Sequence, residues 1–126
     1  MVGAVGLECF WYLPPITNAD TWISTWENYC SNIQSAGMKL VAFTVEDRYG
    51  FGLTPASQDE VFRTNINARI RASAFYDYLV DMDARNPDMN PANNWRTFDG
   101  THANTNGAAW QARFVVNCLP ASLGGP

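Results

Sequence analysis

The sequence has no long apolar segment and few basic residues. No apolar run approaches the roughly 20 residues that span a bilayer, so we expect a soluble chain without a membrane span. The start, MVGAVGLECF, has neither the basic region nor the small-residue cleavage site of a secretory signal, and nothing indicates a compartment. Lys and Arg number 8 against 12 Asp and Glu, and they are scattered. Nucleic acid is not an expected partner, because phosphate binding requires clustered basic side chains.

Cysteine is also scarce, and its spacing does not fit a metal site. Cys9, Cys30 and Cys118 are far apart, and their odd number leaves at least one thiol unpaired within a monomer. We interpret them as small buried hydrophobic side chains, with one disulfide as the alternative. We therefore predict no metal site.

The composition is that of one globular domain. Hydrophobic residues make up 47% of the 126 residues and charged residues 16%, which is unlike a disordered chain. We expect a single domain over residues 1–126, with a frayed tail from about residue 121.

Hydrophobic periodicity and turn residues predict an alternation of strands and helices. The apolar stripe of the first helix comprises Trp22, Ile23, Trp26, Tyr29, Cys30 and Ile33, and Gly37 can end that helix in a left-handed turn. Ser57 and Glu60 have the spacing of a capping box at the start of the second helix. The expected elements are strands in 2–13, 39–45 and 74–82, helices in 21–36, 57–72 and 106–117, and a loop in 83–94.

This order predicts an α/β fold with three layers, in which a mainly parallel sheet has helices on both faces. Three strands make a narrow sheet for such a fold. In open sheets of this kind, reactive groups collect in loops at the carboxyl ends of the strands.

One such loop contains Asp99 and His102, the chain's single histidine. A carboxylate can accept the proton of one imidazole nitrogen, which leaves the other nitrogen free to take a proton from a nucleophile. The structural alternative is a helix-capping aspartate beside a surface histidine, and an isolated D-x-x-H pattern favours that alternative.

The stretch FDGTHANTNGAAWQA resembles the last conserved block of the SGNH (GDSL-type) hydrolases. The matching residues are Asp99, Gly100, Thr101, His102, Gly107, Ala108 and Ala109. Two other stretches, TWENYCSNIQSAGMKLVAFTV and RTNINARIRASAFYDYLVDMD, resemble the helix and strand pairs that precede this block in the family. The resemblance implies a flavodoxin-like sheet, here shortened at its N-terminal side.

The resemblance also implies an activity, namely hydrolysis of carboxylic esters through an acyl-serine intermediate. His102 would be the general base and Asp99 its orienting partner, with no metal or organic cofactor. Gly6 and Glu8 stand where the family has an oxyanion-hole motif, although an anionic glutamate would repel an oxyanion and is better read as solvated or part of a lid. Trp11 could bind substrate, and Trp95 and Phe98 flank the His102 loop, where either a binding or a core role is open.

The chain lacks the family's G-D-S block, so the nucleophile is not assigned. None of its serines sits on an expected strand-to-helix turn. These serines are Ser24, Ser31, Ser35, Ser57, Ser73 and Ser122.

Two alternatives therefore stand beside the esterase. The first is a non-catalytic hydrolase half-domain that self-associates through the open edge of the strand in 2–13, which predicts a homodimer. The second is a carbohydrate-binding module that uses the aromatic side chains near Trp11.

Overall fold

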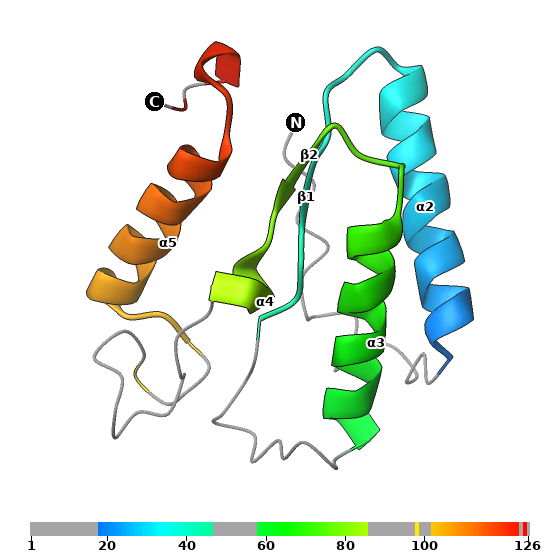
Figure 1. The fold of residues 1–126 in the computed structure, drawn as a ribbon, viewed down its shortest axis with the longest axis horizontal. Coiled ribbons are helices and arrows are strands. Elements are labelled where there is room, and N and C mark those ends of the chain that lie inside the picture. Colours follow the sequence, from blue (N-terminus) through cyan, green and yellow to red (C-terminus); the bar gives the residue numbers. More distant parts are fainter. Residues whose placement is uncertain (1–17, 47–57, 86–97, 99–101, 124, 126) are drawn as a thin grey trace.

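The computed structural model describes residues 18–46, 58–85, 98, 102–123 and 125. They form a small mixed α/β domain that is mostly helical and contains a two-stranded parallel sheet (Figure 1). The elements in chain order are α2 (Ala19–Ser35), β1 (Val41–Phe43), α3 (Gln58–Ala72), β2 (Tyr78–Val80), α4 (Met82–Arg85), α5 (Thr105–Cys118) and the 3-10 turn η2 (Ala121–Leu123). Within these ranges no helix is long and apolar enough to cross a membrane. The strand expected in 2–13 lies outside the described residues.

Helix α2 begins two residues earlier than predicted because Asn18 caps it. The Asn18 Oδ1 accepts hydrogen bonds from the backbone N–H groups of Asp20 (2.8 Å) and Thr21 (3.4 Å), which satisfies two donors that the helix itself leaves unpaired. Gly37 follows the helix with φ +76°, so the predicted left-handed turn is confirmed. Tyr29 is 46% exposed, so its assignment to the buried stripe was wrong.

Strands β1 and β2 pair in parallel, as predicted, with Val41 opposite Tyr78 and Phe43 opposite Val80. Both strands are shorter than the sequence predicts. The pairing of β2 ends at its N-terminal side because Asp77 bonds to the backbone of Leu40. The Asp77 Oδ2 accepts the Leu40 N–H at 2.9 Å, and the Asp77 N–H donates to the Leu40 carbonyl at 3.0 Å.

The loop predicted over 83–94 is wrong at its start, where α4 forms one helical turn. Asp81 explains the turn, because its Oδ1 accepts the backbone N–H of Ala84 at 3.1 Å in the manner of an N-terminal cap. In addition, the Asp83 N–H donates to the Thr44 Oγ1 at 2.9 Å, which ties α4 to the end of β1.

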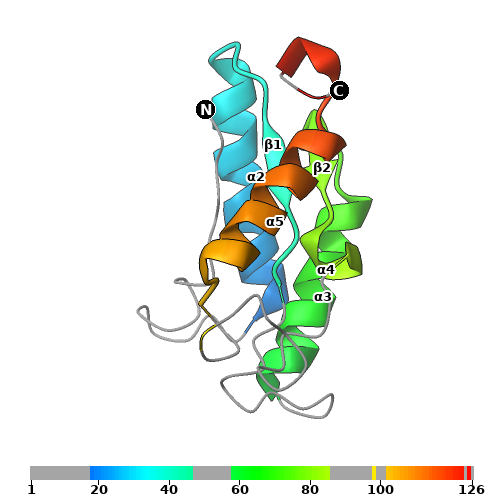
Figure 2. The same ribbon diagram turned by 90° about the vertical axis from the view of Figure 1, so that its left-hand side faces the viewer.

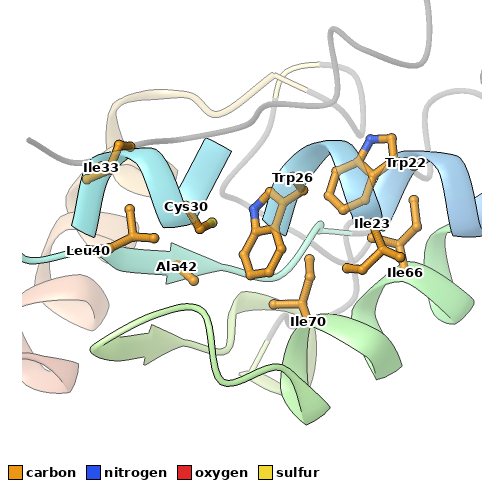
Figure 3. Packing of buried hydrophobic residues seen from close by; sticks show 9 residues of the cluster. All are labelled: Trp22, Ile23, Trp26, Cys30, Ile33, Leu40, Ala42, Ile66 and Ile70. Carbon is orange, nitrogen blue, oxygen red and sulfur yellow. The ribbon is translucent and has the colours of Figure 1, made fainter. Parts of the chain in front are cut away.

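Alternate residues of the two strands pack on opposite faces of the sheet. Helices α2 and α3 cover one face, where the core lies (Figures 1 and 3). This cluster contains Trp22, Ile23, Trp26, Cys30, Ile33, Leu40, Ala42, Ile66 and Ile70. Full burial of an isoleucine side chain contributes roughly 1.5–3 kcal/mol, so the two isoleucines of α3 are principal anchors of this face.

Helix α5 lies against the other face (Figure 2). The buried residues there are Val41, Val80 and Met82, and partly buried Phe43, Tyr78, Trp110, Phe114, Val115, Cys118 and Leu119 surround them. Trp110 and Phe114 stack with ring centroids 5.5 Å apart. The sheet therefore packs apolar residues on both of its faces, as is usual for parallel strands.

The C-terminal segment forms a helix and a short 3-10 turn. Helix α5 begins at Thr105, before the expected Asn106, because the Asn104 Oδ1 accepts the N–H groups of Asn106 (2.9 Å) and Gly107 (3.0 Å). Residues 121–123 form a 3-10 turn in which the Leu123 N–H donates to the Pro120 carbonyl at 2.8 Å. The expectation of a frayed tail from about residue 121 stays a prediction.

The two described cysteines, Cys30 and Cys118, are both free thiols. Cys30 is 1% exposed and belongs to the core, which confirms its interpretation as a small hydrophobic side chain. Burial, together with the charge of Glu27, raises the pKa of the Cys30 thiol to about 11. Cys9 lies outside the described residues.

Candidate functional site

The candidate site lies at the end of the domain where the carboxyl ends of β1 and β2 meet the N-terminal ends of α3 and α5 (Figure 1). Residues 44–46 follow β1 there, and Asp81 and Asp83 follow β2. The segment that carries His102 leads directly into α5. This is the edge at which the sequence predicts reactive groups.

His102 is exposed at this edge. Its carbonyl accepts the backbone N–H of Phe98 at 3.0 Å, so the two residues lie close together. The residue on the other side, Asn104, uses its side-chain oxygen to cap α5. His102 is therefore held by a hydrogen bond at its own carbonyl, and Asn104, two residues later, is held by its cap on α5.

Several predicted site residues lie outside the described residues. They are Asp99, Gly6, Glu8, Trp11 and Trp95. The pairing of Asp99 with His102 and the roles assigned to the other four residues therefore stay predictions.

The buried side-chain amide of Asn67, which the sequence analysis did not identify, bonds to the backbone just past the end of β1. Asn67 of α3 is fully buried, its Nδ2 donates to the Val45 carbonyl at 2.8 Å, and its Oδ1 accepts the Val45 N–H at 2.7 Å. The guanidinium of Arg63, only 6% exposed, donates to the same carbonyl at 2.7 Å. Val45 lies beyond the paired residues of β1, so side chains of α3 supply the partners that its buried backbone needs.

The spacing of Arg63 and Asn67 in the sequence is an ambiguous indication of their buried contacts. Arg63 and Asn67 are four residues apart on α3, beside Ile66 and Ile70 of the buried face. A polar pair at that spacing is as typical of a solvated flank as of a buried clamp. Only the position of Val45, which is distant in the sequence, distinguishes the two.

An ion network continues from this clamp along the same edge. Arg63 binds Glu60, with Nε to Oε2 at 2.7 Å, and also binds Asp83. Arg71 binds both Asp81 (Nη2 to Oδ1, 2.8 Å) and Asp83 (Nη2 to Oδ2, 2.6 Å). The Thr44 hydroxyl donates to the Asp81 Oδ1 at 2.9 Å, so the network joins α3 to the ends of both strands.

The network keeps its carboxylates ionised. Hydrogen bonds from Arg71 lower the pKa of Asp81 from its ordinary value despite partial burial. Burial alone would raise the pKa of Asp83, but the hydrogen bonds and charges of Arg63 and Arg71 outweigh it and lower that pKa. Carboxylates held in this way are unsuited to exchange protons at neutral pH. Their role here is to fix the edge of the sheet rather than to react.

A second link joins the end of β1 to α5. Gln111 donates from Nε2 to both carboxylate oxygens of Glu46, at 3.0 and 3.1 Å. Glu46 follows the clamped Val45, and Gln111 lies on the helix that His102 precedes. The segment of His102 is therefore connected to both strands through α5 and α3.

The described serines offer no nucleophile at this edge. None of them follows β1 or β2 or lies in the segment before α5. The Ser24 hydroxyl donates to the Thr21 carbonyl within its own helix at 3.1 Å, and Ser73 lies near Glu27, with its Oγ 3.4 Å from the Oε1 of that residue. Ser57 is outside the described residues, and its predicted capping box with Glu60 stays a prediction.

The described part of the chain contains no group of three or more His, Cys, Asp or Glu side chains arranged to hold a metal ion. A scan against protein-family models, a search of curated proteins and a search of solved structures each return no match to this chain.

Proposed function

We propose that this chain is a carboxylic ester hydrolase of the SGNH type, with His102 as general base and Asp99 as its orienting partner. The observation that carries the proposal is the exposed imidazole of His102 in the segment between the sheet edge and α5, set in the sequence FDGTHANTNGAAWQA. The finer fold proposed with it is a three-layer fold whose sheet includes a further parallel strand from residues 2–13.

The proposed reaction consumes an ester and water and yields an acid and an alcohol. His102 takes a proton from a nucleophilic hydroxyl as it attacks the ester carbonyl, then returns the proton to the departing alcohol. Asp99 accepts the N–H of the other imidazole nitrogen and stabilises the imidazolium. Water hydrolyses the acyl intermediate in the second half of the cycle.

Four further positions belong to the proposal. Gly6 and Glu8 are the candidates beside the oxyanion, and Trp11 and Trp95 are candidates for contact with the substrate. The proposed reaction requires no metal or organic cofactor.

The test is hydrolysis of p-nitrophenyl acetate by purified protein. His102→Ala is expected to lower kcat/KM by about a hundredfold or more, because general base catalysis contributes 10²–10⁴-fold. Asp99→Asn is expected to lower it as well. Arg113→Ala, an exposed change on α5, is the matched control and should leave hydrolysis unchanged.

A fluorophosphonate that labels activated serines identifies the nucleophile in the same preparation. Labelling that requires His102 would support the proposal, and the modified peptide would give the residue. Folded protein that neither hydrolyses the ester nor takes the label would contradict it, and would leave the half-domain or carbohydrate-binding alternatives.

A further inference from the structure

Phe98 is the most exposed large apolar side chain among the described residues. Its side chain is 75% exposed, whereas the other exposed large apolar residues range from 40% to 55%. Single apolar residues on a surface are common and by themselves indicate nothing. The position of Phe98 is what distinguishes it from the others.

Phe98 is held next to His102. The Phe98 N–H donates a hydrogen bond to the His102 carbonyl, with 3.0 Å between the nitrogen and the oxygen. With standard bond lengths this contact holds the two Cα atoms within about 7 Å of each other. Both side chains are exposed, and the separation of the two Cα atoms is one that an ester with a chain of several carbons can span.

We propose that Phe98 binds an apolar group of the ester substrate and thereby sets a preference for apolar esters. The inference rests on the proposed function, in which the reacting carbonyl lies at His102. A phenyl ring offers apolar surface to an alkyl or aryl group, and removal of that group from water favours binding roughly in proportion to the area covered. The apolar group can belong to the acyl or to the alcohol side of the ester, and the test distinguishes the two.

The kinetic test compares wild type with Phe98→Ala on two series of esters. In the first, the acyl chain of a p-nitrophenyl ester grows from acetyl to hexanoyl. In the second, the alcohol of an acetate ester grows from ethyl to hexyl. We expect the preference for the longer ester, measured as a ratio of kcat/KM values, to fall about tenfold in one series. The affected series gives the side of the ester that Phe98 contacts.

Phe75→Ala is the matched control. Phe75 is also an exposed phenylalanine, 40% exposed, but it precedes β2 at the amino end of the sheet. The control should keep the wild-type preference. Phe98→Leu, which retains an apolar side chain, should restore much of it. A preference that Phe98→Ala leaves unchanged in both series would overturn the inference while the esterase proposal stood.

A binding measurement tests the same inference without turnover. His102 is the chain's single histidine, so its imidazole gives one set of NMR signals. We expect sodium hexanoate to shift these signals at lower concentration than sodium acetate does, and Phe98→Ala to abolish the difference. A shift by hexanoate in protein that hydrolyses no ester would refute the esterase but retain the apolar site. Equal effects of the two carboxylates in wild type would overturn the apolar site.

Discussion

At Val45, just past the end of β1, the backbone hydrogen bonds are made with side chains of α3 rather than with the neighbouring strand. Its backbone groups lie past the last paired residue of β1, and they are satisfied by Asn67 and Arg63 of α3. The Val45 carbonyl has two donors, whereas the described partner of its N–H is the Asn67 Oδ1 alone. Loss of Asn67 would therefore affect the N–H more than the carbonyl.

The first prediction concerns this amide. Asn67→Leu keeps the size of the side chain but leaves the buried Val45 N–H without its partner, which is expected to lower the free energy of unfolding by about 2 kcal/mol. Urea unfolding followed by tryptophan fluorescence measures the change. Asn65→Leu, an exposed substitution on the same helix, should change it by no more than about 0.5 kcal/mol. Equal stability of the two variants would show that the Asn67 bonds do not support the fold.

Helices were predictable from the sequence because their signals are local. The stripe of α2 is set by spacing along one segment, and Trp22, Trp26 and Ile33 are buried as expected. The starts were less well placed, since Asn18 and Asn104 act as caps one or two residues ahead of the expected positions. Choosing between adjacent polar residues as the cap requires backbone geometry.

Strand ends and the polar clamp were not predictable, because distant residues determine them. Asp77 shortens the pairing at one end through Leu40, and Asp81 starts α4 at the other end. The amino-acid sequence of residues 74–82 by itself does not indicate either contact. His102 is predicted from its motif and stays a prediction, whereas Asn67 carries no motif and acts only because Val45 lies against it.

At the scale of elements, the ion network makes α3 the support for both strand ends. Arg71 pairs with Asp81 and Asp83, and both carboxyl groups have pKa values below their ordinary range. A carboxyl whose pKa is lower in the folded state stabilises the fold above the unfolded pKa, and that contribution disappears as the pH falls through the folded value. The domain should therefore lose stability on the acid side.

The second prediction follows from the lowered pKa values of Asp81 and Asp83. The urea midpoint of wild type is expected to be steady from pH 7 to about pH 5 and to fall below about pH 4, near the ordinary pKa of an aspartate. Asp81→Asn should lower the midpoint at pH 7, because it removes one of the two ionic partners of Arg71, and should make the acid-side fall shallower. Measurements at one fixed ionic strength give both effects. Parallel curves for wild type and variant would mean that Asp81 does not contribute to the acid dependence.

At the scale of the whole molecule, a two-stranded sheet carries the apolar contacts of three helices. Its two faces are covered by α2 and α3 on one side and by α5 on the other. The described residues contain no third strand beside β1 or β2. Unpaired strand edges are templates for pairing with another chain, and the strand expected in 2–13 would extend the sheet and present the next edge.

The third prediction is therefore a homodimer formed through that strand. Light scattering coupled to size exclusion is expected to give twice the 14.0 kDa of one chain at high concentration, with a decrease on dilution. Val5→Pro removes a backbone donor from the proposed edge and should shift the protein toward the monomer. Val5→Thr keeps the N–H and the branched side chain, so it should leave the dimer intact. A wild-type monomer at every concentration would refute self-association, and a dimer unaffected by Val5→Pro would assign the contact to another surface.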